Sequence, residues 1–341
     1  MIEAPPIHEL PPNPPPSHRD RRTGLILFGT LEILLGCLCL LMIGFMVLGQ
    51  QMLARSTGAP ASMRMMIPGM LFYAGAAVAF VWLGVGSIQC RRWARALVLI
   101  LAWVWLFTGL LLVPIMAWLM PRIMASAPAG AQALPVSATV VIVVVQIAFM
   151  SAFFILLPGA LVLFYRSRNV KETCEARDPV RRWTDACPLP VLAGVCLMAW
   201  GTILMLGLAL SGFAMLPFFG ILLTGLPGTL AMIGVACVVF WIGRNWYRLK
   251  VSGWWALVAV TIVFAISNAL TFARVDLIEV YQKLGYPQAQ IDLIQRQGWM
   301  TNSFMARGSL IWVLPMLGYL LWVKRYFRVW KCAQATGSNL R

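Results

Sequence analysis

The chain has 341 residues, of which 61% are hydrophobic and only 11% are charged. A soluble domain carries roughly 25% charged and about 45–50% apolar residues, so this composition excludes an ordinary soluble fold. The net charge of +16 would suit nucleic acid in a soluble protein. Basic residues that flank membrane spans, however, set topology and meet anionic headgroups. We therefore expect the lipid bilayer as the main partner and no binding of nucleic acid.

Eight apolar stretches follow a polar N-terminal tail. Runs of about 20 apolar residues match the roughly 30 Å hydrocarbon layer at 1.5 Å rise per residue. The predicted fold class is therefore all-α, a polytopic helical membrane protein with eight transmembrane helices. The predicted spans are Gly24–Leu48, Ile67–Ser87, Ala96–Met120, Ala138–Tyr165, Leu189–Gly212, Leu222–Ile242, Trp254–Phe272 and Ser309–Tyr326.

The sequence between and around the spans predicts the domain organisation. The N-terminal tail is rich in proline and is expected to form a disordered arm. A charged segment, better interpreted as a linker than as a site, separates two groups of four spans. The predicted parts are a proline-rich tail (1–18), a first four-helix unit (19–166), a charged linker (167–188), a second four-helix unit (189–328) and a C-terminal tail (329–341).

The distribution of basic residues predicts the orientation. With the N-terminus in the cytoplasm, 20 of the 27 lysines and arginines fall on the cytoplasmic side. Long external loops count less in the positive-inside rule, so the last external loop does not reverse this result. We therefore expect both termini in the cytoplasm and an integral, multi-pass protein of a bacterial inner (plasma) membrane.

The second half of the chain is similar to the first at a nearly constant offset. The second span reads PGMLFYAGAAVAFVWLG from Pro68, and the sixth reads PGTLAMIGVACVVFWIG from Pro227. We call the spacing from Pro68 to Pro227 the repeat offset. It also joins Gly159 and Arg166 to Gly318 and Arg325. Four spans per unit give both units the same membrane orientation, so the sequence predicts two parallel four-helix repeats.

The longest external loop, Arg274–Gly308, is the part in which the halves correspond least. Its apolar residues follow a rough helical spacing that is broken by Gly285 and Pro287. This pattern predicts two short amphipathic helices on the external surface. Packing at the membrane interface is the favoured interpretation, and a lid over a cavity is the alternative.

Glu32 is the only acidic residue inside a predicted span. We expect it roughly 12 Å deep, close to the midplane, with Gly29 and Gly36 on its helix face. Either it carries protons or cations, or it is a neutral carboxyl that bonds neighbouring helices. The aligned residue of the fifth span, Pro190, favours the structural role. The candidate intramembrane polar positions are Glu32, Thr108, Gln146 and Asn268.

Residues that carry catalysis or bind metals are scarce in the spans. The two histidines, His8 and His18, lie in the tail, and the eight cysteines lack metal-ligand spacing. We expect no catalytic residue, metal, cofactor or disulfide, and hence no enzyme. The favoured function is a structural or accessory membrane component, working with other membrane subunits or as a homo-oligomer. The alternative is a small-solute or ion transporter that uses the cleft between the repeats.

Overall fold

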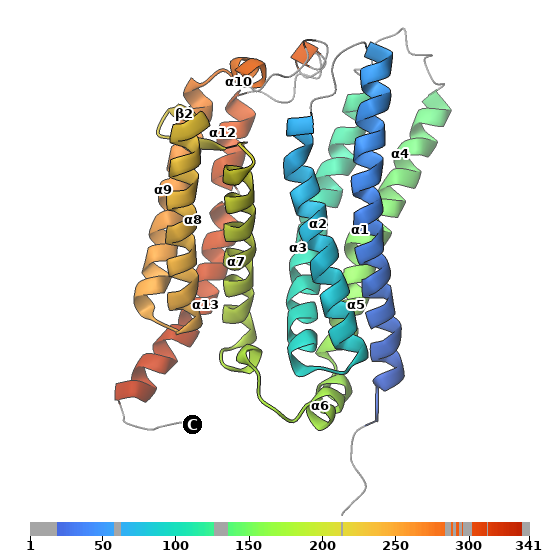
Figure 1. The fold of residues 1–341 in the computed structure, drawn as a ribbon, viewed down its shortest axis with the longest axis vertical. Helices are drawn as coiled ribbons and strands as arrows, with labels where there is room; N and C mark the ends of the chain where they lie inside the picture. The colour runs from blue at the N-terminus through green and yellow to red at the C-terminus, as the bar shows by residue number, and fades with distance from the viewer. Residues whose placement is uncertain are drawn as a thin grey trace, which may run out of the picture.

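The computed structural model describes residues 19–57, 63–125, 136–212, 214–283, 302–311 and 313–335, with Gln288, Ile291, Asp292 and Gln295. Within this part of the chain, 8 helical segments are long and apolar enough to cross a membrane. They run side by side along the long axis of the molecule (Figure 1). The protein is therefore an integral, multi-pass helical membrane protein, as predicted.

Four spans make up the first half. The helices are α1 (Arg22–Thr57), α2 (Met63–Ile88) and α3 (Arg92–Ala125). The fourth span joins α4 (Val136–Ser151), the π-helical turn η1 (Ala152–Leu156) and α5 (Leu157–Arg166). These helices contain the four predicted spans, and α1 to α3 extend beyond them because polar residues continue the helix past the apolar run.

The π-helical turn has a cause in the sequence. Pro158 is the second residue after it, and proline lacks the N–H group that would bond the carbonyl of Phe154 four residues earlier. The backbone of α3 passes against that carbonyl at Gly109, where a side chain would overlap the Phe154 oxygen. A wider turn therefore accommodates the proline, and a glycine on the neighbouring helix leaves room for it.

A linker leads into the second half. The linker contains α6 (Arg168–Arg177) and the short 3-10 helix η2 (Trp183–Asp185). The second half contains α7 (Leu189–Leu210), α8 (Gly225–Tyr247), α9 (Val251–Arg274), α12 (Asn302–Ile311) and α13 (Val313–Ala335). The last span runs from Met305 to Phe327 across α12 and α13.

A β-hairpin that the sequence did not predict precedes α8. Strands β1 (Met215–Phe218) and β2 (Ile221–Thr224) pair antiparallel. The two turn residues, Phe219 and Gly220, both have positive φ, as tight hairpin turns require. The sixth span, predicted to begin at about Leu222, begins as a helix at Gly225, because the first apolar residues of that run form a strand.

The hairpin is fixed on α9 by two hydroxyl groups. The Phe219 N–H donates to Ser267 Oγ at 3.0 Å, and the Gly220 N–H donates to Thr271 Oγ1 at 3.1 Å. Ser267 Oγ in turn donates to the Pro217 carbonyl at 2.9 Å. Polar groups of a predicted span thus hold a loop rather than line a path.

The long loop after α9 is described in part. Its first predicted short helix is confirmed as α10 (Leu277–Lys283). Most of the second predicted helix lies outside the described residues, although Ile291 and Asp292 are helical.

Both ends of the described chain lie at the same end of the bundle, where α1 begins, α13 ends and α6 lies (Figure 1). We call it the basic end, because the loop residues Arg91 and Arg92 and the α8–α9 residues Arg244, Arg248 and Lys250 lie there. The hairpin and α10 lie at the opposite end (Figure 1).

Each half has its own cluster of buried side chains. Four positions recur in both clusters at the repeat offset. The pairs are Leu83/Ile242, Cys90/Leu249, Val98/Leu257 and Leu161/Leu320.

The loops at the basic end also recur in detail. Cys90 and Leu249, which the repeat offset joins, have left-handed φ values of 55° and 54°. The Arg91 N–H bonds the Gly86 carbonyl, and the Lys250 N–H bonds the Asn245 carbonyl, each at 2.9 Å. The α2–α3 and α8–α9 connections therefore share one backbone turn.

Candidate functional site

Glu32 lies buried in the first half, with 2% of its surface exposed. From the end of α5, the Tyr165 hydroxyl oxygen lies 2.9 Å from its Oε1, within hydrogen-bonding distance. From the end of α2, the Ser87 hydroxyl donates to its Oε2 at 3.1 Å. The two hydroxyl oxygens are themselves 2.9 Å apart. We call Glu32, Ser87 and Tyr165 the carboxyl cluster.

Glycines let α1 and α2 approach closely beside the carboxyl cluster. A Cβ on Gly29 would lie 2.8 Å from the Gly84 carbonyl oxygen, and a Cβ on Gly84 would lie 2.5 Å from the Gly29 oxygen. A Cβ on Gly36 would lie 2.7 Å from Val81. The prediction that small residues share the Glu32 face and admit a neighbouring helix is thus confirmed.

The structure gives Glu32 polar partners that the sequence analysis did not name, Ser87 and Tyr165. These partners stand one residue before the ends of α2 and α5, so the cluster lies towards the basic end rather than at the middle of the bundle. The expected depth was counted along α1 alone, whereas Ser87 and Tyr165 place the cluster beside the ends of α2 and α5.

The other three candidate positions do not join Glu32. The Thr108 hydroxyl donates to the Val104 carbonyl at 2.8 Å, and the Asn268 amide donates to the Phe264 carbonyl at 2.8 Å. Each bond returns to the residue's own helix four positions earlier. Gln146 lies half-buried on α4. The four predicted positions therefore form no common site.

In the second half, different residues occupy the positions that correspond to the carboxyl cluster. Trp246, which the repeat offset aligns with Ser87, is fully buried, and its indole N–H donates to the Gly253 carbonyl at 3.0 Å. A Cβ on Gly194 would lie 2.7 Å from the Trp246 ring. The Pro190 carbonyl accepts a hydrogen bond from the Tyr319 hydroxyl at 2.6 Å. An aromatic ring thus fills the space that the carboxyl cluster occupies in the first half.

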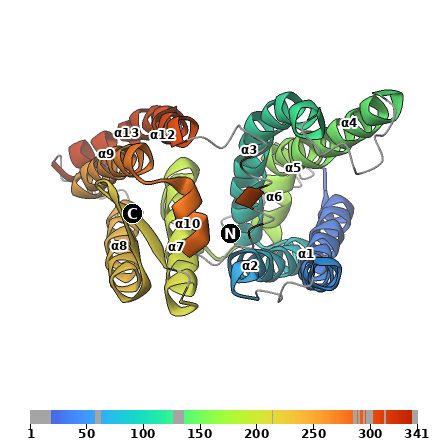
Figure 2. The same cartoon turned by 90° about the horizontal axis from the view of Figure 1, so that it is seen from above.

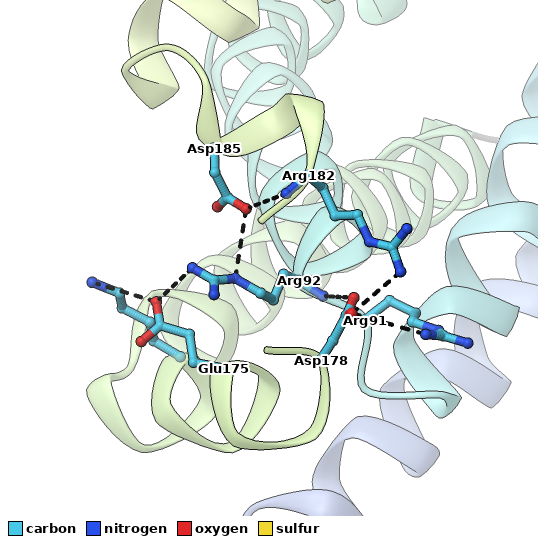
Figure 3. A network of polar contacts seen from close by, with 7 residues as sticks. Arg91, Arg92, Glu175, Asp178, Arg182 and Asp185 are labelled. Atoms are coloured by element: carbon cyan, nitrogen blue, oxygen red, sulfur yellow. Dashed lines mark hydrogen bonds and ion pairs between the residues drawn. The ribbon is translucent and has the colours of Figure 1, made fainter. Parts of the chain in front are cut away.

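A network of charged side chains joins the linker to the α2–α3 loop at the basic end (Figure 3). Arg92 is its centre. Its Nε lies 3.5 Å from Asp185 Oδ2, and its Nη2 lies 3.5 Å from Glu175 Oε1. Lys171 Nζ approaches the same Glu175 oxygen at 3.9 Å. We call these residues, with Arg91, Asp178 and Arg182, the linker network.

Asp178 is the buried member of the linker network, with 3% of its side chain exposed. Arg182 Nη2 lies 3.3 Å and Arg91 Nη1 lies 3.9 Å from its Oδ1. The backbone N–H of Arg92, the first residue of α3, donates to its Oδ2 at 3.4 Å. The carboxylate therefore also caps the N-terminus of α3, where negative charge is stabilising.

Further contacts tie the linker to the start of α1 and to the second half. Arg177 Nη2 lies 3.0 Å from Asp20 Oδ2, and this hydrogen bond lowers the pKa of the Asp20 carboxyl. The Tyr247 hydroxyl at the end of α8 donates to the Trp183 carbonyl at 3.0 Å. The linker is thus attached to both halves.

The sequence alone did not identify the partners of Glu32, and it did not predict that the linker is an ordered segment. Ser87 and Tyr165 are 55 and 133 residues away from Glu32, so only the helix packing brings them together. The only signal in the sequence was that Ser87 and Tyr165 both lie at the ends of predicted spans. For the linker, the alternation of both charge signs between Lys171 and Asp185 was an available signal of internal pairing.

The cysteines described by the structure are seven free thiols. Burial raises the pKa of the Cys174 thiol to about 12 and that of the Cys187 thiol to about 11. Such thiols stay protonated and unreactive at neutral pH. Among the described residues, no group of three or more His, Cys, Asp or Glu side chains could hold a metal ion.

Comparison with known protein families, with curated proteins and with solved structures found no match.

Proposed function

We propose that this protein is a non-enzymatic structural or accessory component of its membrane, built from two parallel four-helix units with both termini in the cytoplasm. The observation that carries this proposal is which groups the polar side chains of the spans bond. Glu32 bonds Ser87 and Tyr165, and Ser267 holds the hairpin. Thr108 and Asn268 bond their own helices. These groups hold the fold together and do not line a common path.

The proposed duplication has structural support beyond the sequence pattern. The recurring left-handed turn and the four recurring core positions share the repeat offset of the sequence match. The contact between the loop and the following helix also recurs, because Gly86 faces Ala94 in one half and Asn245 faces Gly253 in the other. Each pair contains one glycine that allows the close contact. In the first half this glycine is Gly86, before the turn, and in the second half it is Gly253, after the turn.

A small-solute or ion transporter is the second candidate. The observation that favours it is Glu32 itself, since ionisable residues in spans often mark proton or ion pathways. The cluster, however, lies inside the first half between α1, α2 and α5. The contact between the halves is formed instead by α7 against α2 and α3, with Trp200 packed against Gly75.

Reconstitution into proteoliposomes separates the two functions. With a trapped pH indicator and an imposed potassium-diffusion potential, we expect proton flux no faster than in protein-free liposomes. For the accessory role, we expect the chain extracted from its own membrane in mild detergent to migrate as a larger species than the purified chain. A protein-dependent flux that Glu32→Gln removes would instead establish the transporter.

A further inference from the structure

A groove lies between α7 and α8 in the half of the spans towards the basic end. It has a volume of about 250 Å³. Its apolar walls come from Val195, Met198, Ala199, Val239, Phe240 and Gly243, and Arg244 and Tyr247 lie at its end. The volume is below the roughly 300–1,000 Å³ of pockets for drug-sized ligands, so the groove suits a narrow apolar chain.

The groove exists because the second half packs differently from the first. In the first half, Gly84 and Gly29 bring the backbones of α1 and α2 together. The repeat offset aligns Gly243 with Gly84, but Gly243 faces the Met198 side chain, which would lie 3.6 Å from an added Cβ. Because Gly243 faces the Met198 side chain and not a second glycine, this side chain separates α7 and α8. Figure 2 shows that these two helices form one side of the second half.

The charge at the mouth of the groove is positive and uncompensated. Arg244, Arg248 and Lys250 are exposed. The sequence from Ala186 to Val275 contains no acidic residue, and none of the ion pairs among the described residues involves these three cations.

The same turn in the first half is neutralised by protein. There Arg91 and Arg92 pair with Asp178, Glu175 and Asp185 of the linker network. The α8–α9 turn keeps the backbone geometry and the positive charge, but among the described residues its cations form no ion pair with a carboxylate. An anion from outside the chain would neutralise the cations of this turn. At the end of a membrane span, an anion that is attached to an apolar chain is a phospholipid headgroup.

We propose that an anionic phospholipid binds at the basic end of α7 and α8, with one acyl chain in the groove and its phosphate on the Arg244 guanidinium. The guanidinium is suited to phosphate because its planar fork can donate two parallel hydrogen bonds. Arg248 and Lys250 add charge next to the headgroup. This site is independent of whether the protein is an accessory component or a transporter.

Native mass spectrometry of the full chain in a neutral detergent tests the site. The probes are phosphatidylglycerol and phosphatidylcholine with identical acyl chains. We expect phosphatidylglycerol to bind at least about fivefold more tightly, and Arg244→Gln to remove most of this difference, since one cation near the headgroup accounts for roughly that factor. Arg166→Gln is the matched control, because it removes an exposed arginine at the same end of the first half and should change nothing.

Filling the groove tests the acyl chain separately. Ala199→Phe, or Val239→Phe if the first variant does not fold, should weaken binding of both lipids, while inorganic phosphate at millimolar concentration should displace neither. Circular dichroism checks that each variant keeps its helices. Equal binding of the two lipids, unchanged binding to Arg244→Gln, or displacement by phosphate alone would overturn the proposal.

Discussion

At the scale of single residues, the carboxyl cluster is best explained with a protonated Glu32. Three oxygen–oxygen contacts of 2.9, 2.9 and 3.1 Å connect the carboxyl with the hydroxyls of Ser87 and Tyr165. A neutral carboxyl closes a ring of three hydrogen bonds: its Oε1–H donates to the Tyr165 hydroxyl, the Tyr165 hydroxyl donates to Ser87, and the Ser87 hydroxyl donates to Oε2. An ionised carboxylate would leave the contact between the two hydroxyl oxygens without a proton. A neutral group also avoids the cost of a buried charge.

The first prediction follows from this arrangement. Glu32→Gln should leave stability almost unchanged, because the amide keeps a donor and an acceptor for the two hydroxyls. Glu32→Leu should lower the free energy of unfolding by about 0.6–2 kcal/mol, the range of interhelical hydrogen bonds in membrane proteins. Reversible unfolding in mixed micelles measures both changes. A large loss for Glu32→Gln would show that the carboxyl is ionised and that its charge is needed.

The second prediction concerns the thiol of Cys174. Burial raises its pKa from 9.0 to about 12. The folded state therefore favours the protonated thiol, and this contribution to stability is complete below pH 9 and is lost as the pH rises towards 12. We expect the loss of stability between these pH values to be smaller in Cys174→Ser than in the unmodified chain.

Thiol modification gives an independent measurement of the same property. In a variant that keeps Cys174 as its only cysteine, a maleimide should react slowly at pH 7 in the folded state and rapidly after denaturation in detergent. Fast reaction in the folded state would show that this thiol is accessible and contradict its burial.

The sequence revealed single residues where composition or local spacing carried the signal. Glu32 stood out as an acid in an apolar run, and Gly29 and Gly36 fell on its face by helical periodicity alone. Ser87 and Tyr165 could not be assigned as its partners, because serine and tyrosine at span ends are ordinary interfacial residues. Only tertiary packing selects these two among the alternatives.

At the scale of elements, the linker acts as an ordered connection rather than a simple spacer. Asp178 accepts the first N–H of α3 and pairs with Arg182, and Asp185 pairs with Arg92. Because Tyr247 also bonds the Trp183 carbonyl, the same short segment contacts α3 and α8. A change at Asp178 should therefore disturb the linker as a unit.

The third prediction tests this role with a matched pair of variants in the linker. Asp178→Asn removes the charge of a side chain that is 3% exposed and should lower the free energy of unfolding by about 1–3 kcal/mol. Glu172→Gln makes the same change in charge at a surface pair with Arg168 and should have little effect, because exposed ion pairs contribute little.

Thermal unfolding and limited trypsin digestion measure the two effects. The first variant should be cleaved faster after Arg181 and Arg182, because the linker loses its attachment to α3. Equal digestion of the two variants would show that the linker network does not order this segment.

The sequence predicted elements well where one physical signal dominated. Every predicted span is present, since a run of apolar residues of bilayer length has few alternatives to a helix. The hairpin before α8 was missed because Pro217, Phe218, Phe219 and Gly220 continue the apolar composition of the span. Its placement depends on hydroxyls of α9 that come 48 and 51 residues later, which local periodicity does not reveal.

At the scale of the whole molecule, the two halves of the chain differ at the basic end of the bundle. The first half neutralises its loop cations with the carboxylates of the linker, and the second leaves Arg244, Arg248 and Lys250 exposed. Both ends of the described chain and the linker lie at this basic end (Figure 1). The inner leaflet of a plasma membrane carries the anionic lipids that would attract such a surface.

The last prediction is therefore the orientation of the molecule. Fusions of alkaline phosphatase should be active after Ser56, at the end of α1 far from the basic end, and inactive after Lys171 in α6. Fusions of green fluorescent protein should show the reverse. Activity of both phosphatase fusions would contradict eight spans, because the C-terminal end of α1 and α6 lie at opposite ends of the bundle (Figure 1). Activity after Lys171 alone would keep the eight spans but place the basic end outside, against the 20 of 27 lysines and arginines that favour the cytoplasm.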